Sequence, residues 1–222
     1  MTQAPSTAMP TLLFPPDMEP QFQGQTPFEV FERWMGEAEQ AEPADANAMQ
    51  LATVDAAGLP NLRTVLLKGT EDQSAGAFAL LFYTNYNSAK GRELDASGVC
   101  AVNFHWKSLR RQFRARGDVA RVEAEVSDAY FHSRPHGSRI GASVSAQSQP
   151  LASRSMLMAE TQALAARYPT TPPRPAHWGG YRLIPREVEF WEDGPYRQHN
   201  RFRWTRQAAD ADAPWLVERL YP

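Results

Sequence analysis

The first periodic segment of the chain begins at Thr26. Apolar side chains then recur three and four residues apart, as on the buried face of a helix: Phe28, Phe31, Trp34, Met35 and Ala38. Thr26 followed by Pro27 and Glu29 predicts a capping box with proline at the first helical position. We therefore expect a helix that starts here and ends before Pro43.

Beyond this helix the pattern changes to short apolar or alternating runs that end at turn residues, as is typical of strands. The predicted strands are residues 49–54, 61–68, 78–85, 99–106, 111–122, 180–184, 187–191, 202–206 and 215–220. Within the fifth of these, Gly117 and Asp118 indicate a bulge or a turn.

Few helices are expected between these strands. A short one follows the cap Ser88, two flank Pro135 with Ser127 capping the first, and a longer one covers 152–167 before a linker at 169–175. Many short strands with few helices favour a mainly β barrel with peripheral helices over a doubly wound sheet. Residues 1–25, rich in Pro, Gln, Thr and Ser, are expected to form a flexible arm, and 26–222 a single domain.

Composition narrows the class of protein. The net charge of −2 over 222 residues gives no general attraction to nucleic acid or to anionic membranes. Basic residues nevertheless gather between Lys107 and Arg121, where they form either a solvated strand pair or a local anion site. Neither a GxGxxG nor a P-loop motif occurs.

The remaining compositional signals concern location and metals. The single cysteine, Cys100, lies in an apolar run, so no intrachain disulfide and no cysteine-rich metal site is expected. The N-terminus lacks a signal-peptide pattern, and no apolar run approaches the length of a membrane span. A cytoplasmic protein without membrane or nucleic-acid partners is the expectation.

Three segments combine residues that bind anions. Arg63 and Lys68 bracket an apolar strand, and Lys90 follows Ser88 at a strand-to-helix junction, where free N–H groups favour phosphate. Tyr130 and Arg134 lie four residues apart on one helix face. Taken singly, the first segment is better explained by ordinary strand-end charges and the third by a plain helix surface, whereas the second is equally compatible with a plain capped helix.

The last segment is the strongest physical signal of a site. Arg197, His199 and Arg201 alternate, so an extended chain would project all three to one face. Such a triplet is unfavourable unless an anionic group lies opposite it. The alternative is a solvated strand edge.

Together these segments resemble the pyridoxine/pyridoxamine 5′-phosphate oxidase family. The matching segments, in family order over residues 47–222, are RTVLLK (63–68), FYTNYNSAKG (82–91), RQFRARG (111–117), YFHSRP (130–135), IGA (140–142), QS (147–148), WGGYR (178–182), EFW (189–191), RQHNR (197–201) and RLYP (219–222).

The resemblance implies an FMN-binding split β-barrel that forms a homodimer, with FMN at the interface between subunits. By matching position, FMN contacts would come from Arg63, Lys68, Tyr83, Thr84, Lys90, Gln112, Gln147, Ser148, Trp191 and Arg201. The substrate phosphate would contact Lys68, Tyr130, Arg134 and Ser138, while Arg197 and His199 would reach the pyridine ring as catalytic residues.

The implied reaction is hydride transfer from C4′ of pyridoxine or pyridoxamine 5′-phosphate to FMN, which gives pyridoxal 5′-phosphate. O2 then reoxidises the flavin to give H2O2, and the amine substrate also releases ammonia. Three positions differ from the family pattern: Ala89 stands where an arginine is frequent, Asn200 where an aspartate is usual, and Arg139 where a glutamine is common. A related flavin enzyme with another substrate, or a protein that binds FMN or pyridoxal phosphate without turnover, are the alternatives.

Overall fold

The structure is a computed structural model that describes residues 18–19, 22, 25–72, 77–206 and 214–222. Within these residues one antiparallel sheet contains nine strands. The strands are β1 (Ala48–Val54), β2 (Pro60–Leu66), β3 (Gly69–Asp72), β4 (Phe78–Asn85), β5 (Val99–Trp106), β6 (Arg111–Arg121), β7 (Trp178–Glu192), β8 (Asn200–Thr205) and β9 (Leu216–Arg219). The helices are α1 (Pro27–Ala41), α2 (Ala89–Ser97), α3 (Ala124–Ser133), α4 (His136–Val144) and α5 (Arg154–Arg167).

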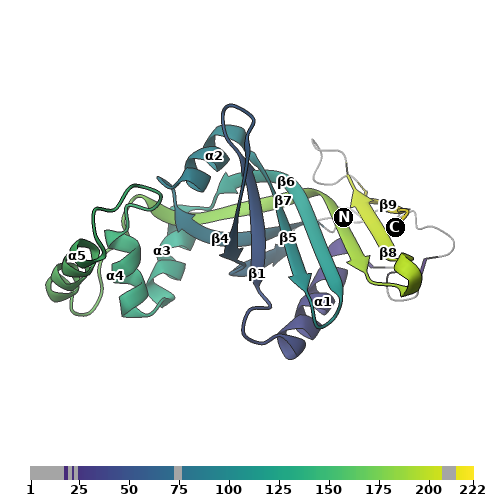
Figure 1. The fold of residues 1–222 in the computed structure, drawn as a ribbon, viewed down its shortest axis with the longest axis horizontal. Helices are drawn as coiled ribbons and strands as arrows, with labels where there is room; N and C mark the ends of the chain where they lie inside the picture. The colour runs from purple at the N-terminus through teal and green to yellow at the C-terminus, as the bar shows by residue number, and fades with distance from the viewer. Residues whose placement is uncertain (1–17, 20–21, 23–24, 73–76, 207–213) are drawn as a thin grey trace, which may run out of the picture.

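The strand order makes the sheet curl into a barrel. Neighbours run β2-β1-β5-β6-β7-β4-β3, and β2 leads through Leu67 and Lys68 directly into β3. The chain itself therefore joins the two ends of the series, and the backbone N–H of Lys68 donates to Leu81 O at 2.8 Å. Strands β8 and β9 extend from β7 away from α3 to α5 (Figure 1). The expected mainly β barrel with peripheral helices is confirmed.

Helix α1 covers one end of the barrel core. It begins as predicted, because Thr26 and Glu29 complete the capping box and Pro27 occupies the first position. The buried face of α1 packs on strand aromatics, with Phe31 and Phe113 centroids 4.6 Å apart and those of Trp34 and Phe190 5.1 Å apart. Fully burying one such side chain contributes about 1.5–3 kcal/mol, so this contact ties α1 to the sheet.

Residues 1–17 of the predicted flexible arm lie outside the described residues, so that part of the prediction stays untested. Two residues further along the arm are in the core: Met18 is 2% exposed and Phe22 is 1% exposed. Phe22 contacts Phe202 with ring centroids 4.8 Å apart. Packed structure therefore extends N-terminal to the predicted boundary at residue 26.

The longest strand differs from the prediction. Residues 180–184 and 187–191, expected as two strands, form one strand, β7, that continues through Pro185. The predicted bulge is present, because the register of β6 against β7 shifts between Arg116 and Gly117, opposite Pro185. A proline is tolerated there because the ladder is already irregular at a bulge. A Cβ on Gly117 would lie 2.1 Å from Ile184 O, so the close approach requires glycine.

One further local prediction was wrong, and one strand was missed. Ser127 does not cap α3: the cap is Glu123, and Ser127 lies buried inside the helix, where its Oγ accepts from the Gly180 N–H at 3.1 Å. Strand β3 was not predicted, because its sequence, GTED, has no alternating apolar residues. The linker expected at 169–175 contains neither helix nor strand, as predicted.

Candidate active site

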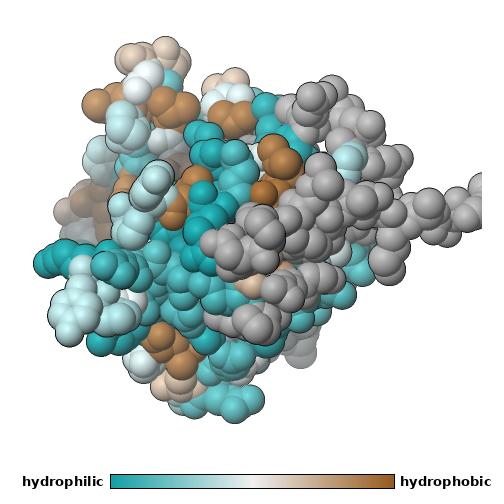
Figure 2. Space-filling model, turned by 90° about the vertical axis from the view of Figure 1, so that its right-hand side faces the viewer, coloured by the Kyte–Doolittle hydropathy of each residue, from teal (hydrophilic) through white to brown (hydrophobic). Residues whose placement is uncertain are grey.

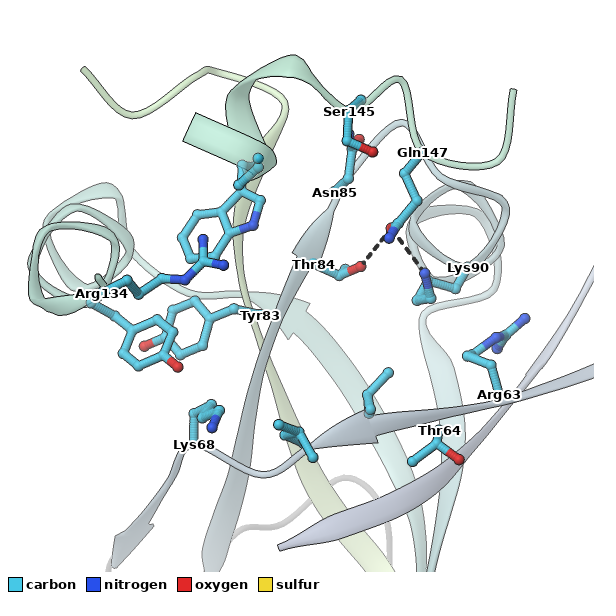
Figure 3. Close-up of a pocket in the computed structure, with 16 residues that line it drawn as sticks. Arg63, Thr64, Lys68, Tyr83, Thr84, Asn85, Lys90, Arg134, Ser145 and Gln147 are labelled. Carbon is cyan, nitrogen blue, oxygen red and sulfur yellow. Dashed lines mark hydrogen bonds between the residues drawn. The ribbon is translucent and has the colours of Figure 1, made fainter. Parts of the chain in front are cut away.

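A cavity of about 470 Å³ lies beside β2 and β4, between α2 on one side and α3 and α4 on the other (Figure 3). The strand ends and helix starts around it supply polar side chains, whereas its floor is partly apolar. Its lining residues are Arg63, Thr64, Val65, Leu66, Lys68, Tyr83, Thr84, Asn85, Lys90, Tyr130, Arg134, Gly141, Ala142, Ser145, Gln147 and Trp178.

The lining of this cavity is strongly cationic. It includes two arginines and two lysines, Arg63, Lys68, Lys90 and Arg134, and the described residues that line it include no aspartate or glutamate. Like charges around one hollow are unfavourable unless an anion compensates them. The cavity is therefore built for a negatively charged ligand.

One side of the cavity is centred on Arg134, at the end of α3. Its guanidinium carbon lies 4.7 Å from the Trp178 ring centroid, a cation–π contact. Among the described residues its Nη1 is buried without a hydrogen-bond partner. Burial lowers the pKa of Arg134, and Tyr130 opposes this only in part. A desolvated guanidinium without a carboxylate is a ready partner for a phosphate.

The opposite side of the cavity is organised by Gln147. Its Oε1 accepts from Thr84 Oγ1 at 3.2 Å and from Lys90 Nζ at 3.0 Å, and Figure 3 shows both bonds. Burial, reinforced by the charge of Arg63, lowers the pKa of Lys90. Arg63 itself is held by Glu93, 3.2 Å from its Nη2. Lys90 is thus the cation on this side with the greater need of an anionic partner.

The sequence around Lys90 explains how the lysine is placed. Ser88 caps α2 as predicted, with its Oγ accepting from the Gly91 N–H at 3.2 Å. Gly91 is required there, because a Cβ would lie 2.2 Å from Tyr86 O. The tight start of α2 therefore presents Lys90 and the helix N-terminus to the cavity.

The other predicted site residues lie elsewhere. Gln112 and Trp191 are paired in the β6–β7 register, Trp191 is paired with Arg201 on β8, and its ring centroid lies 4.7 Å from that of His199. We call Gln112, Trp191, Arg197, His199 and Arg201 the β7–β8 cluster. In Figure 1, β8 lies at the opposite end of the long axis from α3 and α4. One chain therefore does not bring this cluster to the cavity.

The expected common face of Arg197, His199 and Arg201 is wrong. The chain is not extended there, because Pro195–Arg197 forms a 3-10 turn in which Tyr196 and Arg197 have positive φ angles of 55° and 65°. Each of the other two members has an anionic partner. Glu189 Oε1 lies 2.9 Å from Arg201 Nε, and Asp193 Oδ1 lies 3.0 Å from His199 Nδ1.

The carboxylate of Glu189 is unusually buried for a charged group. Burial alone would raise its pKa, yet the pKa is lowered because Arg201 and Arg114 both hydrogen-bond to it. Arg201 also donates from Nη1 to Tyr221 O at 2.8 Å. These contacts fix β8 against β7 and the C-terminal residues. Among the described residues visible on this face, hydrophilic ones predominate around separate apolar patches (Figure 2).

Eight predicted residues line the cavity: Arg63, Lys68, Tyr83, Thr84, Lys90, Tyr130, Arg134 and Gln147. Ser148 is adjacent, since its Oγ accepts from the Ala89 N–H at 3.1 Å, whereas Ser138 is exposed on α4 outside the lining. Sequence reasoning missed Asn85 and Ser145, which are joined by a bond from Asn85 Nδ2 to Ser145 O at 2.9 Å. Their signal was weak, because a short amide and a hydroxyl beside turns are common everywhere.

Comparison with known proteins decides the family. A model described as pyridoxamine 5′-phosphate oxidase matches residues 35–168, and one described as the pyridoxine 5′-phosphate oxidase C-terminal dimerisation region matches 178–222. The chain belongs to the pyridoxine/pyridoxamine 5′-phosphate oxidase family. A family member from Paracoccus denitrificans is 58% identical over 84% of both chains, and one from Cereibacter sphaeroides 54% over 90% of this chain and 97% of its own.

Solved structures related to the family share the fold. PhzG from Burkholderia lata, crystallised with tetrahydrophenazine-1-carboxylic acid, has a TM-score of 0.83 at 28% identity and covers 97% of this chain and all of its own. A pyridoxamine 5′-phosphate oxidase-related, FMN-binding protein from Nostoc punctiforme has a TM-score of 0.70 at 18% identity, covering 90% and 99%. None of the helices in the described residues is long and apolar enough to span a bilayer.

Proposed function

We propose that this protein oxidises pyridoxine 5′-phosphate and pyridoxamine 5′-phosphate to pyridoxal 5′-phosphate, with FMN as its cofactor. The observation that carries the proposal is the convergence of predicted FMN and phosphate ligands on one cationic cavity in a chain of this family. The cavity residues would hold FMN as the acceptor for a hydride from C4′ of the substrate, and O2 would take up the two electrons as H2O2; with the amine substrate, water would be consumed and ammonia released.

The cavity residues fit two phosphate groups rather than one. Lys90, the N-terminus of α2 and Arg63 would hold the phosphate of FMN on one side. Arg134, Tyr130 and Lys68 would hold the phosphate of the substrate on the other. Figure 3 shows Lys90 and Arg134 on opposite sides of the cavity, which supports separate roles.

Arg197 and His199 are proposed to act from a second copy of the chain. The β7–β8 cluster lies away from the cavity of its own chain, and it falls in the segment matched by the dimerisation-region model. In a two-fold dimer each cavity would receive the cluster of the other subunit. Arg197, with its delocalised guanidinium cation, would orient the C4′ substituent, and His199 would exchange a hydrogen bond or proton with it.

A test of the reaction uses the FMN-loaded protein without oxygen. Pyridoxine or pyridoxamine 5′-phosphate should bleach the flavin absorption, and admission of air should restore it with pyridoxal 5′-phosphate formed. Bound flavin that neither vitamer reduces would reject the proposal. Reduction by a different anionic substrate would then favour a related flavin enzyme; PhzG, which shares this fold, was crystallised with a carboxylic acid of another class.

A test of the shared site mixes two variants that are each strongly impaired when assayed at a vitamer concentration well below the KM of the wild type. Arg134→Ala damages the cavity and Arg197→Ala damages the cluster, so a hybrid dimer contains one doubly damaged and one intact site. Refolding an equal mixture should restore about a quarter of wild-type activity, because half of randomly formed dimers are hybrids with one working site. Activity that stays at the level of the separate variants would contradict a site built from two subunits.

A further inference from the structure

His199 has two neighbours at the same ring nitrogen. Asp193 Oδ1 lies 3.0 Å from Nδ1, and the Gly194 backbone N–H points at the same atom with an N···N distance of 3.2 Å. Among the described residues no partner contacts Nε2. The ring is largely enclosed, with 18% of its side chain exposed, and it packs against the Trp191 ring.

The two contacts at Nδ1 require different proton positions. Without a proton, Nδ1 could accept from Gly194, but its lone pair would then face a carboxylate oxygen at 3.0 Å, which is repulsive. With a proton, Nδ1 donates to Asp193 in a charge-assisted hydrogen bond. The carboxylate is only 15% exposed, so water screens this interaction weakly.

We propose that Asp193 is a positioning residue that holds the proton of His199 on Nδ1 and so leaves Nε2 as the acceptor facing the substrate. The same arrangement balances the positive charge whenever Nε2 takes up a proton. The role in catalysis rests on the proposed function, whereas the position of the proton does not.

The structure holds Asp193 from both sides. Its second oxygen, Oδ2, pairs with Arg110, and its backbone N–H donates to Arg110 O at 3.0 Å. Arg110 lies in the turn before β6 and has a positive φ of 54°, so this turn is shaped to meet the end of β7. A carboxylate fixed in this way constrains the imidazole it contacts.

The residue after His199 supplies no negative charge. It is Asn200, a neutral amide. Asp193 supplies a carboxylate to His199 from the end of β7 instead. In this chain the negative charge next to His199 therefore comes from Asp193, which precedes the turn at Pro195–Arg197, and not from the residue that follows the histidine.

The experiment is ¹⁵N NMR of the FMN-loaded, full-length protein labelled at histidine, with Asp193→Ala, Arg110→Ala and His199→Gln as variants. The His199→Gln spectrum assigns His199 among the five histidines by the signal that disappears. Wild type should show a protonated Nδ1 and an unprotonated Nε2. In Asp193→Ala the proton should move to Nε2, because Gly194 N–H is then the remaining partner of Nδ1.

Arg110→Ala is the matched control. It removes the second ion pair of Asp193 but keeps the carboxylate beside His199 and the backbone hydrogen bond from Asp193 N–H to Arg110 O. The proton should therefore stay on Nδ1, and kcat should fall less than in Asp193→Ala. Asp193→Ala should lower kcat about tenfold or more while KM for the vitamer changes little. A proton on Nε2 of His199 in the wild type would overturn the inference, and this result does not depend on the folding of any variant. A proton that stays on Nδ1 in Asp193→Ala would overturn it as well. If the wild type carries the proton on Nδ1 but turns over neither vitamer, the proposed function is rejected and the inference about the proton is not.

Discussion

Tyr83 of β4 and Tyr130 of α3 stack with ring centroids 3.9 Å apart and planes inclined by 22°. Trp178 continues the stack, with its ring 5.6 Å from that of Tyr83 and inclined by 12°. The three rings form an aromatic wall that fixes α3, and hence Arg134, against the sheet. Burial, with Tyr130 adding to it, raises the pKa of Tyr83, so its phenol stays neutral in the range where the enzyme is expected to work.

Tyr130→Phe separates the packing of the tyrosine ring in the aromatic wall from the proposed binding of phosphate by its hydroxyl. The ring stack remains, so the urea midpoint should stay close to wild type. The hydroxyl is lost, and a hydrogen bond to a charged group contributes about 1.5–3 kcal/mol, so KM for the vitamer should rise roughly ten- to a hundredfold. Steady-state kinetics with both vitamers measure this. Tyr130→Ala should also lose about 0.5–1.5 kcal/mol of unfolding free energy, and an unchanged KM in Tyr130→Phe would contradict phosphate binding by the hydroxyl.

Arg134→Ala should weaken substrate binding without weakening FMN binding. Its guanidinium is desolvated and lacks a carboxylate partner among the described residues, so it is held for a ligand rather than for the fold. We expect KM to rise about tenfold or more, with little change in the unfolding free energy of the apoprotein. Fluorescence titration of FMN provides the comparison: a parallel loss of FMN affinity would show that the two phosphate sites are not separate.

The lowered pKa of Lys90 predicts a pH dependence of FMN binding. Below that pKa the lysine is protonated and pairs with phosphate; as the pH rises through it, the ammonium of the free protein is lost earlier than for an exposed lysine. The Kd for FMN should therefore increase on the alkaline side. Lys90→Arg keeps its charge there, so its Kd should change less with pH. If the Kd for FMN rises equally at alkaline pH in the wild type and in Lys90→Arg, a group other than Lys90 causes the pH dependence.

Gly117 provides a test of the fold. Gly117→Ala places a methyl group 2.1 Å from Ile184 O and 2.8 Å from Pro185 Cα, both on backbone that is held in the sheet. We expect a loss of about 3 kcal/mol or more in unfolding free energy, in the range of severe steric mutations. Gly36→Ala is the control, since among the described residues nothing lies within 4 Å of the place that a methyl group would take at this position of α1. The unfolding free energy of Gly36→Ala should be unchanged or rise by about 0.5–1 kcal/mol. Similar urea midpoints for Gly36→Ala and Gly117→Ala would contradict the requirement for glycine at the bulge.

The sequence predicted most of the secondary structure because its signals were local. The capping box at Thr26 and the cap at Ser88 each depend on residues within one turn, and both are present. The failures are non-local. Ser127 has the composition of a cap, but its hydroxyl serves Gly180, more than fifty residues away in the chain. Phe22 looked like part of an arm because its partners, among them Phe202, lie at the other end of the sequence.

The site residues were likewise predicted well where the signal was a local motif and poorly where it depended on the path of the backbone. Residues named from motifs on β2, β4, α2 and α3 line one cavity, since the sheet order brings those elements together. The alternation of Arg197, His199 and Arg201 failed because it assumed an extended chain, whereas two left-handed residues turn the backbone. Asp193 could not be assigned to His199 from sequence, because the turn that brings them together depends on those two φ angles.

Strand β7 carries Trp178 at its first residue, in the cavity, and Trp191 near its last, in the β7–β8 cluster. In the proposed dimer, one strand thus contributes to two different flavin sites. Occupancy by FMN and association of the subunits then become linked equilibria, each strengthening the other. Dilution should release flavin, and added FMN should hold the dimer together at concentrations where the apoprotein dissociates.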